Sequence, residues 1–217
     1  MTDFAAARRH MVDGQVRTAD VTDLRLIAAM LEIARERFVP QAALAYIDLD
    51  VPLGGGGRTT RRLLKPMVLA KLIQAADVKA SDRVLDVGCA TGYGAAVLSR
   101  LASQVIALEQ DESLIQAASA ALSSLPNVHT VPGPLAEGWP KDAPFDVIVL
   151  EGATEIPPQA LCRQLKDGGR LVCVLGSGPG SKAMLYCRSG EEIGSRPIFD
   201  ATAAVLPGFV KPPVFAF

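Results

Sequence analysis

The sequence predicts an α/β protein built around a doubly wound, mostly parallel sheet. Apolar runs of strand length alternate with helical patterns after residue 66, and the first run ends in a glycine-rich turn that opens a helix. Such alternation is typical of parallel strands joined by crossover helices. The five expected parallel strands are residues 83–86, 105–109, 128–131, 145–150 and 170–175.

The first 37 residues have the pattern of a helical cap. Helical periodicity runs over residues 3–37 in two pieces that break near residues 17–21. In the second piece, the side chains expected to point inward are Leu24, Ile27, Ala28, Leu31 and Ala34. The charged side chains expected to point outward are Arg25, Glu32 and Arg35. We therefore expect residues 1–65 to form a helical cap and a glycine-rich flap. Residues 66–217 would form an α/β domain, and the two together one compact unit.

Later helices have clear boundaries in the sequence. Pro66 opens a helix where its missing amide costs little, and Leu69, Leu72, Ile73 and Ala76 line one face of that helix. Residues 111–122 form a second expected helix with acids in its first turn, and residues 157–165 are largely helical.

Composition excludes several classes of function. The 217 residues suit one domain, the hydrophobic fraction of 49% indicates a folded core, and a net charge of −1 gives no reason to expect nucleic acid or a membrane surface as a partner. The four cysteines lack Cys-x-x-Cys pairing, and no apolar run reaches the length of a membrane span, so the expected location is the cytoplasm. His10 and His129 have no metal-ligand spacing, so no metal is expected.

Residues 51–66 contain four consecutive glycines and a cluster of cations. A phosphate loop is not expected, because the lysine of Gly-x-x-x-x-Gly-Lys-Ser/Thr is missing. We expect a mobile flap over a pocket, since glycine permits many backbone conformations. Arg61 and Arg62 are candidates for binding an anionic substrate, because a guanidinium grips a carboxylate with two donors. The alternative is a solvated basic loop.

The turn after the first parallel strand is the strongest candidate site. Gly88, Ala90 and Gly92 leave room for a ligand against the backbone, the amides that open the next helix face it, and Asp86 adds a negative acceptor. Dinucleotide folds need a third glycine where Tyr93 stands, so they fit poorly. Glu109 ends the next apolar run, at about the spacing where an acid takes ribose hydroxyls in nucleotide-binding α/β folds.

An acid two residues before this small-residue turn resembles motif I of S-adenosylmethionine-dependent methyltransferases, with Ala90 in place of the middle glycine. Residues 11–17 and 35–40, then Gly138-Trp-Pro and Glu155-Ile-Pro, resemble segments of the protein-L-isoaspartate O-methyltransferase family in the same order. The resemblance implies a seven-stranded Rossmann-like methyltransferase sheet, with residues 183–189 and 196–206 as extra strands and one antiparallel element. It also implies S-adenosylmethionine as cofactor and S-adenosylhomocysteine as product. The cofactor-binding residues that it implies, together with the turn itself, are Asp86, Gly88, Cys89, Ala90, Thr91, Gly92, Tyr93, Glu109, Gln110, Leu135 and Glu151.

The chain departs from that family at the cofactor and acceptor sites. Gly133-Pro-Leu135 stands where the family has Gly-Asp-Gly, so the aspartate contact to adenine is lost or moved to a backbone group. Glu151 stands where a threonine is common. Arg62 and Leu64 align with the threonine and serine that line the family's methyl-acceptor site. Thr59 and Thr60 could replace those hydroxyls as catalytic residues if the loop is shifted.

The resemblance implies an enzyme that esterifies the free carboxylate of isoaspartyl residues in aged proteins or peptides. A carboxylate is already ionised at neutral pH, so the reaction needs no general base. Two alternatives stay open: a methyltransferase of the same fold with a different acceptor, and a non-catalytic S-adenosylmethionine-binding protein. A dinucleotide oxidoreductase is the weakest alternative.

Overall fold

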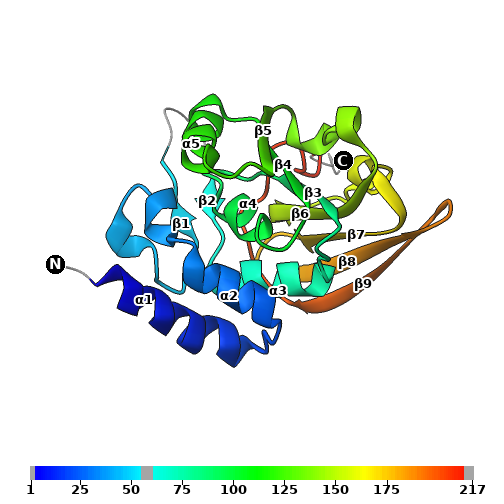
Figure 1. Cartoon of the computed structure of the whole chain (residues 1–217). Helices are drawn as coiled ribbons and strands as arrows, with labels where there is room; N and C mark the ends of the chain where they lie inside the picture. Colours follow the sequence, from blue (N-terminus) through cyan, green and yellow to red (C-terminus); the bar gives the residue numbers. More distant parts are fainter. Residues whose placement is uncertain (1–2, 55–60, 213–217) are drawn as a thin grey trace.

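A computed structural model describes residues 3–54 and 61–212, in which seven strands form one sheet in the order β5-β4-β3-β6-β7-β8-β9 (Figure 1). Strands β3 to β7 are parallel, whereas β8 runs antiparallel to β7 and β9 antiparallel to β8. The predicted doubly wound, mostly parallel seven-stranded sheet is confirmed. The seven strands are β3 (Arg83–Val87), β4 (Gln104–Glu109), β5 (Val128–Pro132), β6 (Phe145–Thr154), β7 (Leu165–Leu175), β8 (Lys182–Ser189) and β9 (Glu192–Asp200).

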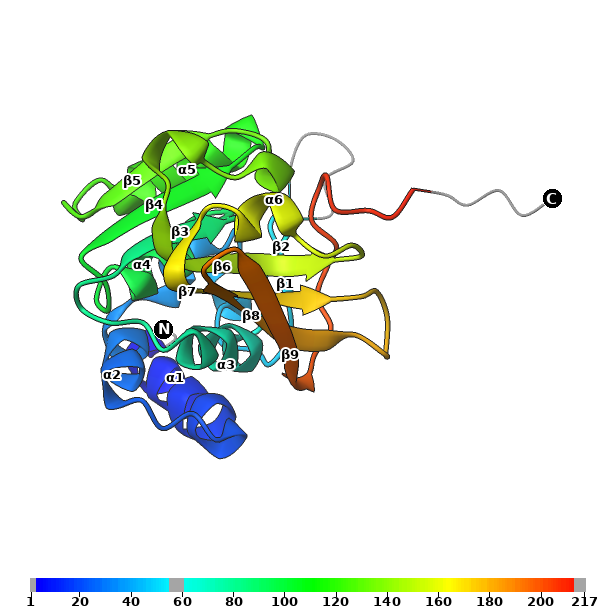
Figure 2. The ribbon, with the colours of Figure 1, turned by 90° about the vertical axis from the view of Figure 1, so that its right-hand side faces the viewer.

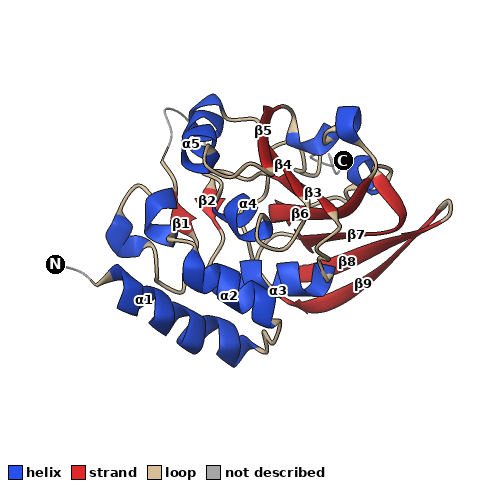
Figure 3. Ribbon diagram, in the orientation of Figure 1, coloured by secondary structure: helices blue, strands red, loops and turns tan. Residues whose placement is uncertain are grey.

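Helices cover the sheet unevenly. Helices α1, α2 and α3 lie side by side on one side of the molecule. Strands β8 and β9 form a long hairpin that extends away from the rest of the sheet (Figures 2 and 3). The two short strands β1 (Val51–Pro52) and β2 (Arg62–Leu63) form a separate antiparallel pair. The α-helices are α1 (Phe4–Met11), α2 (Leu24–Glu32), α3 (Pro66–Ala76), α4 (Tyr93–Leu98), α5 (Glu112–Leu122) and α6 (Gln159–Cys162). The short helical turns are η1 (Val12–Val16), η2 (Arg17–Ala19), η3 (Arg35–Phe38), η4 (Ala42–Leu44), η5 (Leu135–Glu137) and η6 (Pro140–Asp142).

Alternate strand residues feed two hydrophobic cores. Val84 belongs to a core shared with α2 to α5, whereas Leu85 belongs to a second core shared with α6, η5 and residues 206–209. This division follows from the two-residue period of a strand, which sends successive side chains to opposite faces. Residues of the N-terminal cap, such as Met11 and Met30, lie in the first core together with the sheet.

Local sequence signals fix the helix ends where they were expected. Pro66 is the first residue of α3, and the four predicted inward residues of that helix are buried. The carboxylate of Asp111 accepts hydrogen bonds from the amides of Ser113 and Leu114, which caps α5.

Several predictions of side-chain orientation and of element boundaries are wrong. Leu24 is 73% exposed and Ala28 is also exposed, while Leu26 and Met30 face the core instead. Arg35 is completely buried, not outward, because α2 ends at Glu32 and the helical period does not extend to it. The helix expected over residues 157–165 spans only α6. The second extra strand is β9, and residues 201–206 lie beyond its end.

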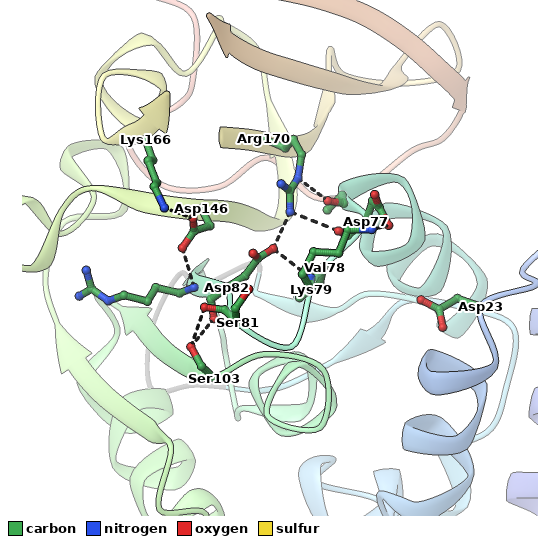
Figure 4. A network of polar contacts seen from close by, with 12 residues as sticks. Asp23, Asp77, Val78, Lys79, Ser81, Asp82, Ser103, Asp146, Lys166 and Arg170 are labelled. Carbon is green, nitrogen blue, oxygen red and sulfur yellow. Dashed lines mark hydrogen bonds and ion pairs between the residues drawn. The ribbon is translucent and has the colours of Figure 1, made fainter. Parts of the chain in front are cut away.

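A polar network ties the amino ends of the central strands together (Figure 4). The guanidinium of Arg170 donates to the carboxylate of Asp82 at 2.5 Å and to the carbonyl of Ala76 at 2.8 Å. Asp146 accepts a bond from Lys166 at 3.0 Å. This network lies at the end of the sheet opposite the glycine-rich turn, which leaves the carboxyl end free for a site.

The helices within residues 3–54 and 61–212 do not include one that is long and apolar enough to span a membrane.

Candidate functional site

The turn between β3 and α4 has a backbone that few side chains tolerate. Gly88, Ala90 and Gly92 all adopt positive φ angles, of 76°, 53° and 95°. The amides of Gly88 and Cys89 donate to the carbonyl of Leu108 at 2.8 and 3.1 Å, which ties the turn to the end of β4. Glycine suits this backbone because positive φ is strained for residues with a Cβ atom, and Ala90 adopts it with the smallest side chain that has one. The predicted glycine-rich turn at the carboxyl edge of the sheet is thus present.

Glu109 is the best-bonded side chain of the site. It is fully buried at the end of β4. Its Oε2 accepts from the amide of Ala90 at 2.9 Å and from Nη2 of Arg61 at 2.7 Å. Its Oε1 accepts from the amides of Gln110 and Asp111 at 2.9 and 3.2 Å. A carboxylate has about four lone-pair positions, so the acceptor capacity of Glu109 is filled from within the chain.

Asp86 and Glu151 form a buried pair of carboxyl groups. None of their four oxygens accepts a hydrogen bond from a donor in the part of the chain that the structure describes. Burial raises the pKa of Asp86 to about 7. Burial, followed by the negative charge of Asp86, raises the pKa of Glu151 well above its usual range. Two buried carboxylates repel each other, so burial and this repulsion both favour a state in which the pair carries a proton over one with two negative charges.

A second buried group lies behind the turn. The ring of Tyr93 packs edge-on against Phe38 at 5.7 Å, and the guanidinium carbon of Arg35 lies 4.6 Å from the centre of the same ring. Burial raises the pKa of Tyr93 to about 12. Arg35 also donates to the carbonyls of Ala45 and Leu64, both at 2.7 Å. These contacts join the cap to the turn, and they make Tyr93 a packing residue in this conformation.

The C-terminal segment closes over the turn. The backbone of residues 204–209 bonds to the end of β6, where the amide of Leu206 donates to the carbonyl of Ala153 at 2.8 Å. The side chain of Leu206 is fully buried. A Cβ atom added to Gly88 would lie 3.2 Å from it, and one added to Gly152 would lie 2.6 Å from it. Leu206 therefore lies directly against both glycines.

Two cavities flank this covered turn. One, of about 410 Å³, is lined by Arg61, Glu109, Gln110, Asp111, Glu112 and Pro207. The other, of about 300 Å³, lies between η3, residues 53–54 and α5 and is lined by Thr91 among others. The hydroxyl of Thr91 donates to the carbonyl of Phe38 at 2.6 Å, so it holds η3 in place.

The structure brings most of the predicted cofactor residues together. Gln110 faces the larger cavity, and its side-chain oxygen accepts a long bond of 3.4 Å from the amide of Leu135. Cys89 is buried beside the acids, and its burial raises the pKa of its thiol well above the usual value, so it is no nucleophile. Among residues 3–54 and 61–212, no three histidine, cysteine or acidic side chains gather as a metal site.

The predicted acceptor residues separate from one another. Thr59 and Thr60 lie outside the described residues. Arg61 is only 5% exposed and pairs with Glu109, whereas Arg62 is exposed on β2. Acceptor binding by either arginine stays a prediction. Leu206 and Pro207 border the site but were not predicted, because no local pattern marks a distant segment that folds back onto a turn.

The residues at this site fit S-adenosylmethionine in part. The positive-φ turn leaves its backbone open to a ligand, Asp86 has acceptor positions without a donor among the described residues, and the larger cavity opens beside Glu109. The acceptor positions of Glu109, however, are already filled from within the chain. The side chains of Arg61 and Leu206 lie against the same face of Gly88.

Solved structures share the whole fold. One titled protein-L-isoaspartate O-methyltransferase matches with a TM-score of 0.82 at 23% identity, over 93% of this chain and 66% of that one. Another, a putative enzyme of that name from Plasmodium falciparum in complex with S-adenosyl-L-homocysteine, matches with a TM-score of 0.77 at 18% identity, over 92% and 97% of the two chains. At these identities the likeness shows the fold, which is the Rossmann-like methyltransferase fold that the sequence predicts.

Sequence comparison is more specific. The family model "Protein-L-isoaspartate(D-aspartate) O-methyltransferase (PCMT)" matches residues 6–197. The protein-L-isoaspartate O-methyltransferase of Methylorubrum populi is 39% identical over 88% of this chain and 89% of its own length. That of Pelotomaculum thermopropionicum is 41% identical over 79% and 75%. The chain belongs to the protein-L-isoaspartate O-methyltransferase family.

Proposed function

We propose that this chain transfers the methyl group of S-adenosylmethionine to the free carboxylate of isoaspartyl residues in damaged proteins or peptides. The observation that carries the proposal is the positive-φ turn at Gly88–Gly92 with Asp86 and Glu109 on either side, in a chain of this family. The cofactor would lie along the turn, with Gln110 and Leu135 toward its adenosine end and Glu151 beside Asp86.

The reaction requires little from the protein beyond positioning the cofactor and the acceptor. The cofactor supplies an electrophilic methyl group on a positively charged sulfur. An acceptor carboxylate is ionised at neutral pH, so no residue needs to remove a proton from it. The side chains of this site would act by binding and orienting the two reactants, which can lower a barrier by about 7 kcal/mol or more.

A different methyl acceptor is the second candidate. Arg62 is exposed and Leu64 is buried at the two positions that align with the acceptor-site hydroxyls of the resembling family. Neither side chain offers the small hydroxyl of threonine or serine. An acceptor other than isoaspartate is therefore favoured if Thr59 and Thr60 do not replace those groups.

The deciding experiment measures transfer of labelled methyl from S-adenosylmethionine to a peptide containing isoaspartate, beside the same peptide with ordinary aspartate. Base-labile label on the isoaspartyl peptide alone supports the proposal. Label on neither peptide, with binding of S-adenosylhomocysteine shown by calorimetry, would point to another acceptor.

The cellular location and the partners of this protein are also proposals. The four cysteines all lie in the described part of the chain and carry free thiols, which supports a reducing, cytoplasmic location. The expected partners are proteins or peptides that carry isoaspartyl residues. We propose neither a nucleic-acid partner nor a membrane partner, and we propose no particular oligomeric state. The division into residues 1–65 and 66–217 stays a prediction.

A further inference from the structure

We infer that Arg61 competes with the cofactor for Glu109, so that S-adenosylmethionine binds only after the Arg61 guanidinium has left this carboxylate. The inference rests on the proposed function, because it concerns the same site. It assigns to Arg61 the role of an internal inhibitor of cofactor binding, in contrast to the acceptor-binding role expected from the sequence.

The acceptor positions of Glu109 are all occupied. Three of its four donors are backbone amides of Ala90, Gln110 and Asp111, which belong to the site's own turns. The fourth donor is Arg61, and its Nη2 atom is 2.7 Å from Oε2. A ribose hydroxyl that donates to Glu109 needs one of these four positions. Only the Arg61 side chain can leave without rebuilding the sheet edge.

The guanidinium of Arg61 lies against the glycine-rich turn. Nη2 of Arg61 also donates to the carbonyl of Gly88 at 2.7 Å, and a Cβ added to Gly88 would lie 3.0 Å from that nitrogen. Arg61 thus lies against the open face of the glycine, where a ligand would approach the backbone. The cavity of about 410 Å³ is bordered by Arg61 itself, so withdrawal of this side chain would extend the cavity toward the turn.

The ion pair of Arg61 and Glu109 is incompletely bonded. Nε of Arg61 is buried and has no acceptor among the described residues. A buried donor without a partner is unfavourable, and a buried ion pair gains little over its desolvation cost. Ligand hydroxyls can therefore replace Arg61 at Glu109.

Competition of this kind has a simple consequence. When only a fraction of the molecules has a free site, the apparent affinity falls by that fraction. If Arg61 has left Glu109 in about one molecule in ten, the apparent affinity for the cofactor falls about tenfold. Removing the Arg61 side chain should remove this penalty.

The test is calorimetric binding of S-adenosylhomocysteine, which carries the same ribose and does not react. The proteins are the wild type, Arg61→Ala, Arg61→Met and, as a matched control, Arg62→Ala at the exposed neighbour. Arg61→Met keeps an apolar stem without a hydrogen-bond donor, in case the alanine variant folds poorly. We expect both Arg61 variants to bind about tenfold more tightly than the wild type, and Arg62→Ala to bind like the wild type.

Equal or weaker binding by both Arg61 variants would overturn the inference and leave the proposed cofactor intact. Binding by none of the four proteins would instead refute the proposed cofactor and the competition together. Thermal unfolding without ligand checks the ion pair itself. Arg61→Ala should melt below Arg62→Ala, because Glu109 loses its only charged partner among the described residues. Equal melting temperatures would also overturn the inference.

Discussion

Glu151 fills the space that a side chain on Gly94 would need. A Cβ atom built on Gly94 would lie 1.7 Å from Oε1 of Glu151, far inside van der Waals contact. Gly94 lies in the first turn of α4, and Glu151 reaches it from β6. The glycine is therefore required by the carboxyl pair of Asp86 and Glu151 that lies beside it.

The variant Gly94→Ala should be destabilised. Overpacking a buried site costs about 1–3 kcal/mol, which exceeds the gain of up to about 1 kcal/mol in helix propensity. Urea unfolding measures the change. The matched control is Gly14→Ala in η1, where an added Cβ meets nothing within 4 Å. The double variant Gly94→Ala/Glu151→Ala should recover stability, and if it does not, the clash is not with Glu151.

The carboxyl pair predicts an unusual pH dependence of stability. The pKa of Asp86 is raised to about 7 in the folded protein, whereas it is about 4 in an unfolded chain. Between these values the folded state binds more protons than the unfolded state, so the free energy of unfolding falls as pH rises from about 4 to about 7. Above that window this group contributes no further change.

Melting temperatures from pH 5 to pH 8 test this dependence. The wild type should lose more stability over the range than Glu151→Gln, whose amide can donate to Asp86 without a titrating proton. The control is Glu112→Gln at an exposed acid of α5, which should follow the wild type. Parallel curves for wild type and Glu151→Gln would show that the pair does not share a proton.

Arg35 should be among the residues whose loss is most damaging to stability. Its two hydrogen bonds to the carbonyls of Ala45 and Leu64 are buried, and truncation leaves both carbonyls unpaired. Bonds to a charged group contribute about 1.5–3 kcal/mol each, so Arg35→Ala should cost about 3–6 kcal/mol in urea unfolding. Arg37→Ala, two residues away and exposed, should stay within about 0.5 kcal/mol. Similar values for the two variants would contradict the role given to Arg35.

Of the two arginines predicted to bind the acceptor, Arg61 is buried and Arg62 is exposed. If Arg62 contacts the acceptor carboxylate, Arg62→Ala should raise the Michaelis constant for an isoaspartyl peptide about fivefold, which corresponds to about 1 kcal/mol for an exposed ion pair. The turnover number should also fall, because the acceptor carboxylate is the group that attacks the methyl and it loses a contact that orients it. Arg9→Ala, an exposed arginine of α1, serves as the control. An unchanged Michaelis constant would leave Arg62 as a solvated surface residue.

Much of the fold follows from local signals in the sequence. The apolar runs at residues 105–109 and 145–150 are strands because each buries almost every side chain, and Pro66 and Asp111 fix the starts of α3 and α5. The prediction that Arg35 points outward was wrong, because a helical period has no meaning past the end of a helix and α2 ends at Glu32. The predicted inward face of α2 was also wrong at Leu24 and Ala28, which are exposed.

The sequence by itself determined the α/β class, the glycine-rich turn after β3 and the acid at the end of β4, since each depends on neighbours a few residues apart. Only the tertiary structure decided what covers that turn. Arg61 and Glu109 are 48 residues apart in the chain, and Leu206 comes from a segment beyond the last strand. Contacts of this kind depend on how the chain folds back on itself, which no periodicity or local motif records.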